Sequence, residues 1–328
     1  MGSGVNVLVG TIGQGVMRSA DDGESWQRSG PDQGMHSDAL VRCLANHPTQ
    51  PDVIFAGTDR GLLRSEDAGS TWRRVDSVLN DIGVWKIAIH PTDARVMFAG
   101  TGTPNPARVY RSEDRGATWH ELPMTAAKEC PAVGVPRVTG IAIDPLQNDT
   151  VWVGLEVDGF RRSRDAGDSW ETLSEAIPNR DVHAVVVTSG PPKSVFIVVN
   201  NDVYTSRDDG TSWIPLGAKQ VYPWTYTRTI AVHPTNPGIV FVSIGDATPG
   251  RTGAVMRSDD VGVTWRQLDL PVSPNSAMWV VDVQPERPDL VFAASRYGYL
   301  YRSDDGGESW VKLWREFSEV SSVLWTPN

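Results

Sequence analysis

The sequence predicts an all-β fold, a single seven-bladed β-propeller with four antiparallel strands per blade, in which the C-terminal strand joins the N-terminal blade and closes the ring. Three observations lead to this prediction. An acidic, glycine-centred phrase recurs seven times in 328 residues. A strand–turn–strand pattern recurs upstream of the copies. The two ends of the chain each carry part of one repeat.

The recurring phrase is Ser-x-Asp-x-Gly-x-(Ser/Thr)-Trp, and its tryptophans return every 43 to 52 residues. A short Asp side chain accepts hydrogen bonds from nearby backbone N–H groups, and Gly supplies the positive φ of a tight turn. The Ser/Thr hydroxyl bonds locally, and the Trp begins the next strand with a large apolar surface. Each phrase therefore predicts a hairpin turn, with its aspartate as a structural clamp and not a catalytic group. The seven aspartates are Asp21, Asp67, Asp114, Asp165, Asp208, Asp260 and Asp305.

The upstream pattern, as in "IAIHPTDARVMFAG" and "IAVHPTNPGIVFVS", predicts two strands joined by a proline-marked turn. Together with the hairpin predicted at the recurring phrase, this pattern gives four strands, A to D, in each period. His47, His90 and His233 recur in the A–B turn, which favours a structural role over a metal triad.

The chain begins with a B strand, "VNVLVGT", and ends with an A strand, "VSSVLWTPN". Pairing these two would close the ring and remove the open sheet edges. We therefore expect one domain over residues 1–328. Its blades are predicted at 319–328 plus 1–30, 38–77, 83–123, 136–174, 181–217, 226–269 and 277–314.

The composition limits the classes of partner. The 30 basic and 40 acidic residues give a net charge of −10, which disfavours a nucleic-acid partner or an anionic membrane. No apolar run reaches the ~18 residues of a membrane helix, and the first residues lack the plan of a signal peptide. The expected location is cytoplasmic, or secreted if an export signal has been removed. Cys43 and Cys130 are read as reduced structural thiols, and neither a metal nor a cofactor is expected.

The phrase resembles the Asp-box, or BNR repeat, over almost the whole chain. That superfamily is known from sialidases, sortilin-type receptors, xyloglucan-degrading enzymes and a photosystem II assembly factor. The chain departs from sialidases in having no Arg-Ile-Pro motif, and from sortilin-type receptors in having two cysteines. It departs from xyloglucan-cleaving enzymes in having repeats for one propeller, and from the assembly factor in having no export signal. The resemblance implies a fold and not an activity, with no specific member favoured.

A functional site is expected on the face opposite the boxes, where the long D–A and B–C loops converge. Aligned A strands place arginine and tryptophan at one equivalent position, with further aromatic and basic residues close by. Such a ring suits an aromatic, anionic or saccharide ligand, because Arg forks onto anions and Trp offers a stacking face. The alternative is that the tryptophans plug the channel and the arginines pair with carboxylates. The candidate ligand-binding residues are Arg42, Trp85, Arg137, Tyr222, Trp224, Tyr226, Arg228 and Trp279.

Catalysis would need an acid or base in the same mouth. His183 could be a general base with Asp181, two residues earlier, orienting it, and Glu129 is a further catalytic candidate. Three functions stay open: a site that binds and could hydrolyse a small ligand, a scaffold for a protein or peptide client, and a glycoside hydrolase with paired loop carboxylates. Whether the protein is an enzyme is uncertain, with hydrolase-like chemistry expected if it is. The loop carboxylates considered are Asp38, Glu129, Glu156, Asp158, Asp181, Asp246 and Glu316.

Overall fold

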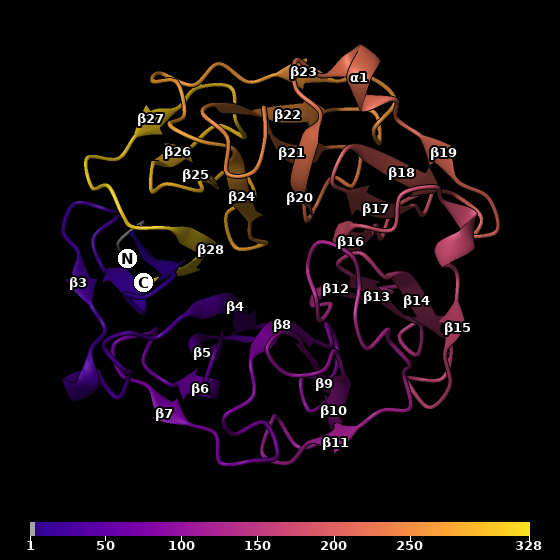
Figure 1. The fold of residues 1–328 in the computed structure, drawn as a ribbon. Coiled ribbons are helices and arrows are strands. Elements are labelled where there is room, and N and C mark those ends of the chain that lie inside the picture. The colour runs from indigo at the N-terminus through magenta and orange to yellow at the C-terminus, as the bar shows by residue number, and fades with distance from the viewer. Residues whose placement is uncertain (1–3) are drawn as a thin grey trace.

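Seven four-stranded antiparallel sheets form a closed ring in the computed structural model, which describes residues 4–328 (Figure 1). The prediction of a seven-bladed propeller is confirmed. The innermost strands are β28 (Val320–Pro327), β4 (Val41–His47), β8 (Val84–Ile89), β12 (Val138–Ile143), β16 (Val182–Val187), β20 (Tyr226–Val232) and β24 (Met278–Val283). The second strands are β1 (Val5–Thr11), β5 (Gln50–Thr58), β9 (Met97–Thr101), β13 (Val151–Leu155), β17 (Val195–Val199), β21 (Val240–Gly245) and β25 (Val291–Ser295).

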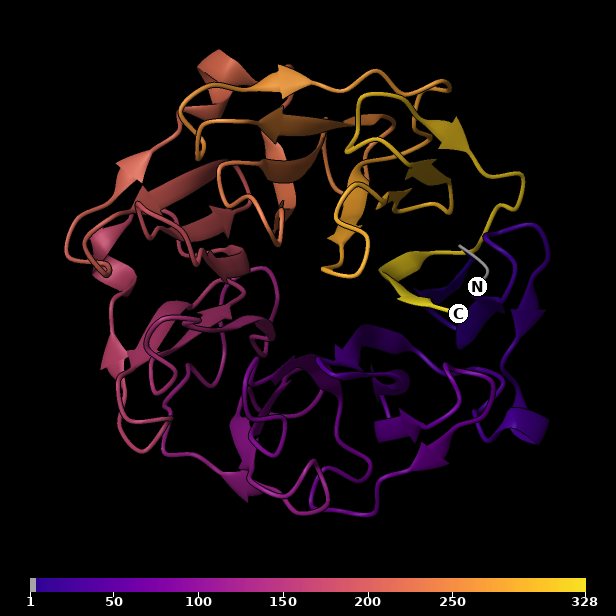
Figure 2. The same ribbon diagram turned by 180° about the vertical axis from the view of Figure 1, so that it is seen from behind.

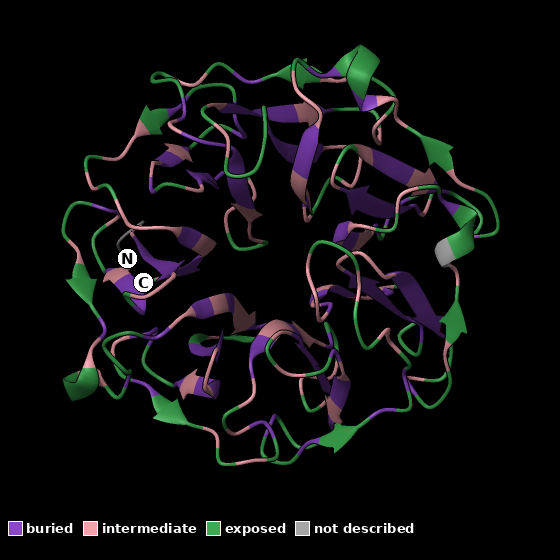
Figure 3. Ribbon diagram, in the orientation of Figure 1, coloured by how far each residue is buried: buried purple, intermediate pink, exposed green. Residues whose placement is uncertain are grey.

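The outer half of each blade contains two shorter strands. The third strands are β2 (Val16–Ser19), β6 (Gly61–Ser65), β10 (Val109–Ser112), β14 (Gly159–Ser163), β18 (Asp202–Ser206), β22 (Gly253–Ser258) and β26 (Leu300–Ser303). The outermost strands are β3 (Gln27–Arg28), β7 (Arg73–Arg74), β11 (His120–Glu121), β15 (Glu171–Thr172), β19 (Ile214–Pro215), β23 (Arg266–Gln267) and β27 (Val311–Lys312). Their two-residue length and exposure leave little free edge for another chain to pair with (Figure 3). Three short helical segments lie in the loops: α1 (Ala218–Val221), η1 (Pro31–Gln33) and η2 (Ser174–Ala176).

The ring closes between its two ends. Strand β1 pairs antiparallel with β28, so that Val7 lies opposite the fully buried Trp325, and both termini lie in this blade (Figure 2). Each innermost strand also contacts the next one around the whole circle. The apolar core consists of seven clusters, each of which lies between two neighbouring blades. Each blade therefore buries its faces against two others, and closure of the ring gives every blade both neighbours.

The Asp-boxes form the C–D turns, and the box of the third blade illustrates their geometry. The Ser112 hydroxyl donates to Asp114 Oδ1 (2.8 Å) and accepts from the Gly116 N–H (2.9 Å). Asp114 also accepts from the backbone N–H (2.8 Å) and hydroxyl (2.6 Å) of Thr118, and the Trp119 indole donates to the Gly116 carbonyl (2.9 Å). The first four bonds recur in all seven boxes, so the carboxylates are engaged within their own turns.

Backbone conformation explains the glycine of the box. Both the glycine and the residue before it have positive φ in every copy. Gly69, at φ 81°, also lies against the neighbouring blade, where a Cβ atom would come within 2.4 Å of the Leu8 side chain. Glycine is therefore needed both for the turn and for the close approach of two blades.

Arginine–backbone hydrogen bonds tie neighbouring boxes together. In five blades the arginine before the box serine donates to a box carbonyl of the next blade. The pairs are Arg18 to Ala68, Arg111 to Ala166, Arg162 to Asp209, Arg257 to Gly306 and Arg302 to Asp22. The last pair joins the seventh blade to the first, so the turns help to close the ring.

No helix among residues 4–328 is long and apolar enough to cross a membrane. Cys43 and Cys130 are both free thiols, and Cys43 is buried.

Candidate functional site

A β-bulge interrupts every innermost strand close to its beginning, on the face opposite the boxes. Here the strand register with its neighbour shifts, and an extra residue lies opposite the second strand. A bulge of this kind redirects a side chain, and bulges are frequent beside active sites. The bulged residues are Ser321, Arg42, Trp85, Thr139, His183, Arg228 with Thr229, and Trp279. We call this ring the mouth of the propeller.

Two tryptophans of the mouth are each covered by two arginines. The guanidinium groups of Arg42 and Arg137 lie 4.3 and 4.9 Å from the ring centre of Trp85. Those of Arg228 and Arg296 lie 4.1 and 4.2 Å from the ring centre of Trp279.

Tyr226 stacks on Trp279 at 6.2 Å, and Trp279 is only 8% exposed. The aromatic rings are therefore already in contact with protein cations, which leaves less of their faces free for a ligand.

The four guanidinium groups are only partly neutralised. Arg137 forms an ion pair with Glu156 at 2.5 Å, and Arg296 forms one with Glu319. Among the described residues, no carboxylate lies within ion-pair distance of Arg42 or Arg228. Burial, followed by repulsion from Arg228 and Arg42, lowers the pKa of Arg296 to about 10. The mouth therefore gathers several cations that act on one another.

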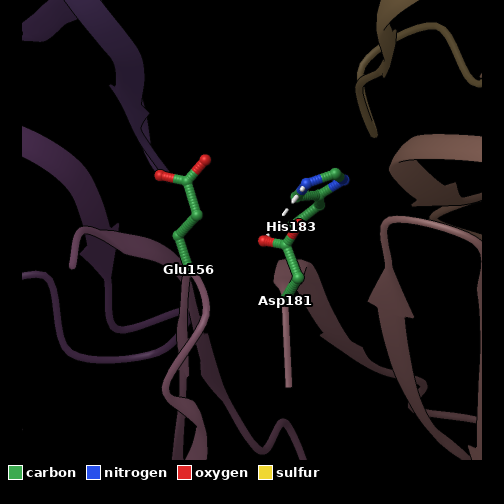
Figure 4. A group of neighbouring side chains, drawn as sticks. All are labelled: Glu156, Asp181 and His183. Carbon is green, nitrogen blue, oxygen red and sulfur yellow. Dashed lines mark ion pairs between the residues drawn. The ribbon is translucent and has the colours of Figure 1, made fainter. Parts of the chain in front are cut away.

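Two carboxylates and a histidine gather at one point of the mouth (Figure 4). Glu156 follows β13, Asp181 precedes β16, and His183 lies on β16; one ligating atom from each lies within 4.8 Å of the others. Burial raises the pKa of Glu156 and of Asp181, while the positive charges of Arg137 and Arg228 oppose these shifts.

His183 is held by a backbone carbonyl. Its Nδ1 lies 2.7 Å from the Thr227 carbonyl, which can only accept, so Nδ1 carries the proton and Nε2 has a free lone pair. Burial and the nearby Arg228 lower the pKa of His183 to about 3, so the ring is neutral at pH 7. Its Nε2 lies 3.6 Å from Asp181 Oδ1, too far for a hydrogen bond. Thr227, and not Asp181, therefore fixes the orientation of His183.

Other predicted site residues lie elsewhere. Tyr222 is buried in the core cluster between the fifth and sixth blades, edge-on to Trp265 at 5.6 Å, and Trp224 packs against the same cluster. Glu129 is exposed and is not part of the Glu156–Asp181–His183 group.

The remaining loop carboxylates have local partners. Asp38 pairs with Arg60, Asp158 with Arg161, and Glu316 with Lys312, and Asp246 accepts from N–H groups of its own loop. Of the seven carboxylates considered, the structure brings together only Glu156 and Asp181.

Sequence reasoning missed Arg296 and the position of Glu156 beside Asp181 and His183. Both residues directly follow a second strand, β25 and β13 respectively, so they occupy equivalent places in their blades. Aligning the residues after "FAAS" and "WVGL" would have indicated both.

A surface pocket of about 890 Å³ lies beside the acidic group, where loops of the fourth and fifth blades meet α1. Its lining includes Val157, Asn179, Arg180, Tyr204 and Lys219. The Asn179 side chain donates to Asn200 and accepts from the Asp181 N–H, so the pocket and the mouth share a polar connection.

Comparisons with known proteins support the fold. The family model described as "Sortilin, neurotensin receptor 3" matches residues 60–154. A xyloglucanase of Acetivibrio thermocellus is 26% identical over 81% of this chain and 37% of its own length. Sortilin of Rattus norvegicus is 27% identical over 48% of this chain and 18% of its own length. The chain thus spans well under half of the curated relatives it matches.

Two solved structures share the architecture. The GH74 xyloglucanase from Xanthomonas campestris has a TM-score of 0.63 and 22% identity, covering 83% of this chain and 45% of that one. A structure described as YCF48 bound to D1 peptide has a TM-score of 0.62 and 17% identity, covering 98% of this chain and 89% of that one. The repeats, the ring and these similarities show a seven-bladed β-propeller whose repeats resemble the Asp-box (BNR) repeat.

Proposed function

We propose that the mouth binds a small anionic ligand, whose carboxylate, phosphate or sulfate group is held by Arg42 and Arg228. The observation that carries the proposal is the charge balance of the mouth. Four guanidinium groups gather there. Only two of them form an ion pair with a carboxylate among the described residues, and these two do not include Arg42 or Arg228. The buried Arg42 Nε has no hydrogen-bond partner within residues 4–328.

An anion would relieve the repulsion between these groups. Like charges in a poorly solvated site destabilise one another, and a guanidinium fork binds a planar or tetrahedral anion through two hydrogen bonds. Ring stacking on Trp85 or Trp279 has less support, because arginines already cover both rings. An acidic saccharide is a natural probe, since the curated relatives include xyloglucanases.

Isothermal titration calorimetry with glucuronate, glucose, phosphate and sulfate tests the proposal. We expect glucuronate or an inorganic anion to bind and glucose not to bind. Arg228→Ala should weaken binding about tenfold or more, through loss of a charge-assisted hydrogen bond, without lowering the melting temperature.

Two controls match this variant. Arg207→Ala removes an exposed arginine from a box on the opposite face, and Asp165→Ala removes a box carboxylate. Both should keep the wild-type affinity. If no anion binds, or if Arg207→Ala is equally damaging, the proposal fails and a peptide client becomes the favoured ligand; YCF48 carries a peptide in its solved structure.

Hydrolysis of a glycoside is a second candidate. The supporting observation is that Glu156 and Asp181 lie with His183 inside 4.8 Å and that both carboxyl pKa values are raised. Retaining glycosidases place two carboxyl groups about 5–5.5 Å apart, one acting as acid and one as nucleophile. Release of sugar from xyloglucan oligosaccharides should be lost in both Glu156→Gln and Asp181→Asn, and should persist with a metal chelator. Activity that survives either substitution would exclude this mechanism.

A further inference from the structure

We propose that Glu156, Asp181 and His183 form a binding site for a divalent transition-metal ion of the Zn²⁺ or Mn²⁺ type. The three side chains come from two neighbouring blades and converge on one point at the mouth (Figure 4). No spacing motif marks them, because Glu156 lies 25 residues before Asp181. The site is distinct from the anion site proposed for Arg42 and Arg228, and does not depend on it.

His183 is prepared as a ligand. Its side chain is 3% exposed, and its Nδ1–H donates to the Thr227 carbonyl at 2.7 Å. Histidine ligands of metals are typically fixed in this way by a carbonyl or carboxylate on the other ring nitrogen. The free Nε2 lone pair faces Asp181 Oδ1 at 3.6 Å, with no hydrogen bond between them. Two acceptors that face each other without a proton leave a polar group unsatisfied, and a cation between them would satisfy both.

Asp181 is oriented from behind. The Asp181 N–H donates to Asn179 Oδ1 at 2.9 Å and the Asp181 carbonyl accepts from the Asn200 N–H at 3.0 Å, while the carboxylate oxygen Oδ1 is buried and without a hydrogen-bond partner in residues 4–328. Val157 has a φ of 62°, an unfavourable conformation for a β-branched residue. The turn between Glu156 and Asp181 thus accepts local strain close to the proposed site.

Glu156 completes the group. Arg137 Nη1 contacts Glu156 Oε2 at 2.5 Å, which leaves the other carboxylate oxygen available. Hydrogen bonds to the outer oxygen of a ligating carboxylate are common at metal sites. Each of the three candidate ligands therefore has one contact that positions it and one atom free to bind.

Distance and donor type select the ion. Bonds of about 2.0–2.2 Å put two ligand atoms on one ion at most about 4.4 Å apart. The observed limit of 4.8 Å therefore requires a shift of roughly half an ångström, which the flexible Glu156 side chain can provide. One imidazole with two carboxylates suits Zn²⁺ or Mn²⁺ better than Ca²⁺ or Mg²⁺, which take all-oxygen sites.

The charge of Arg228 acts on all three groups and opposes the binding of a cation. Removing it should strengthen metal binding at the same time as it weakens anion binding. One substitution is thus expected to move the two affinities in opposite directions, so failure of either proposal can be recognised separately.

The test uses the full chain after chelator treatment, titrated calorimetrically with ZnCl₂ and MnCl₂, with melting curves alongside. We expect Zn²⁺ or Mn²⁺ to bind one per chain and to raise the melting temperature. Asp181→Asn and Glu156→Gln should each weaken binding at least tenfold, while Arg228→Ala should tighten it. Glu129→Gln, which removes an exposed carboxylate outside the group, should leave it unchanged.

His183→Gln is the decisive variant, since it removes the imidazole nitrogen that would bind the metal. If that variant unfolds, the two isosteric carboxylate variants still decide the question. The proposal is overturned if neither metal binds below millimolar concentration, or if binding is unaltered in both Asp181→Asn and Glu156→Gln. Equal loss in Glu129→Gln would also overturn it, because it would indicate general surface binding.

Discussion

The Asp-box rim and the mouth are built from the same repeat, at opposite ends of the same blades, yet they differ in how their polar groups are satisfied. At the rim, the seven boxes keep the same residues and repeat the same local hydrogen bonds. At the mouth, the equivalent bulged position carries serine, arginine, tryptophan, threonine or histidine. Several mouth atoms, among them Arg42 Nε and Asp181 Oδ1, have no hydrogen-bond partner in residues 4–328.

This difference distinguishes the groups that stabilise the fold from the groups that are available to bind a ligand. A group whose hydrogen bonds are closed inside its own turn has no need of a ligand, whatever its charge. A group that is positioned from behind and open in front can bind one. In this propeller the positions that break the repeat, and not those that keep it, are where we place the site.

The largest effect on stability should come from the rim. Ser112 is fully buried, and its hydroxyl both accepts from Gly116 N–H and donates to Asp114. Ser112→Ala leaves the buried N–H without an acceptor and should lower the free energy of unfolding by about 1–3 kcal/mol. Urea denaturation measures it, with the exposed neighbour Glu113→Ala as a control that should change little. A rim variant that keeps full stability but loses ligand binding would reverse our comparison.

Acid should act on the two regions at different pH. The pKa of His183 is lowered to about 3, against about 6.5 when unfolded, so its contribution is complete above pH 6.5 and is lost as the pH falls toward 3. Hydroxyl and N–H donors lower the pKa of Asp21 and Asp305 to about 2. The contribution of these carboxylates to stability is therefore lost only between about pH 4 and 2.

Melting curves of the wild type and His183→Gln between pH 7 and 3 check this order. Burial raises the pKa of Asp282 to about 7, which gives a contribution that is present at low pH and lost as the pH rises through 7. Asp282 is present in both proteins, so its effect cancels in the difference between their melting temperatures. This difference should shrink from pH 6.5 downward, and a constant difference would contradict the assignment of a neutral buried histidine.

A smaller effect is expected at the turn behind Asp181. Val157→Gly removes the strain of a valine at φ 62° and should stabilise the protein by up to about 1 kcal/mol, if the turn keeps its shape. Thermal unfolding measures it, and metal affinity shows whether Asp181 keeps its orientation. A loss of stability would mean that the valine side chain packs more favourably than its backbone is strained.

The smallest effect should come from Tyr222. Its buried hydroxyl has no hydrogen-bond partner among the described residues, so Tyr222→Phe removes an unsatisfied group and should cause no loss of stability. It should also leave anion affinity unchanged, because Tyr222 packs in a core cluster. Weaker binding in this variant would return Tyr222 to the mouth.

Most of the fold could be predicted, since seven copies of one phrase set the number of blades and the partial repeats at the two ends indicated how they join. The site was predicted less completely. Equivalent positions such as Arg42 and Trp85 were found because the A strands align, and Asp181 and His183 because they lie two residues apart. Arg296 was missed, and Tyr222 and Trp224 were assigned to the mouth although they lie at a core cluster, because loops have no periodicity from which a direction can be read.

The sequence by itself determined the repeat, the turn chemistry of the boxes and the closure of the ring, because these depend on residues close together in the chain or on a period repeated seven times. Tertiary structure alone decided which arginines share a tryptophan, that Thr227 and not Asp181 holds His183, and that Glu156 reaches the same point from the neighbouring blade. Those contacts join different blades, and their distances depend on bulges and loop paths that no local pattern specifies.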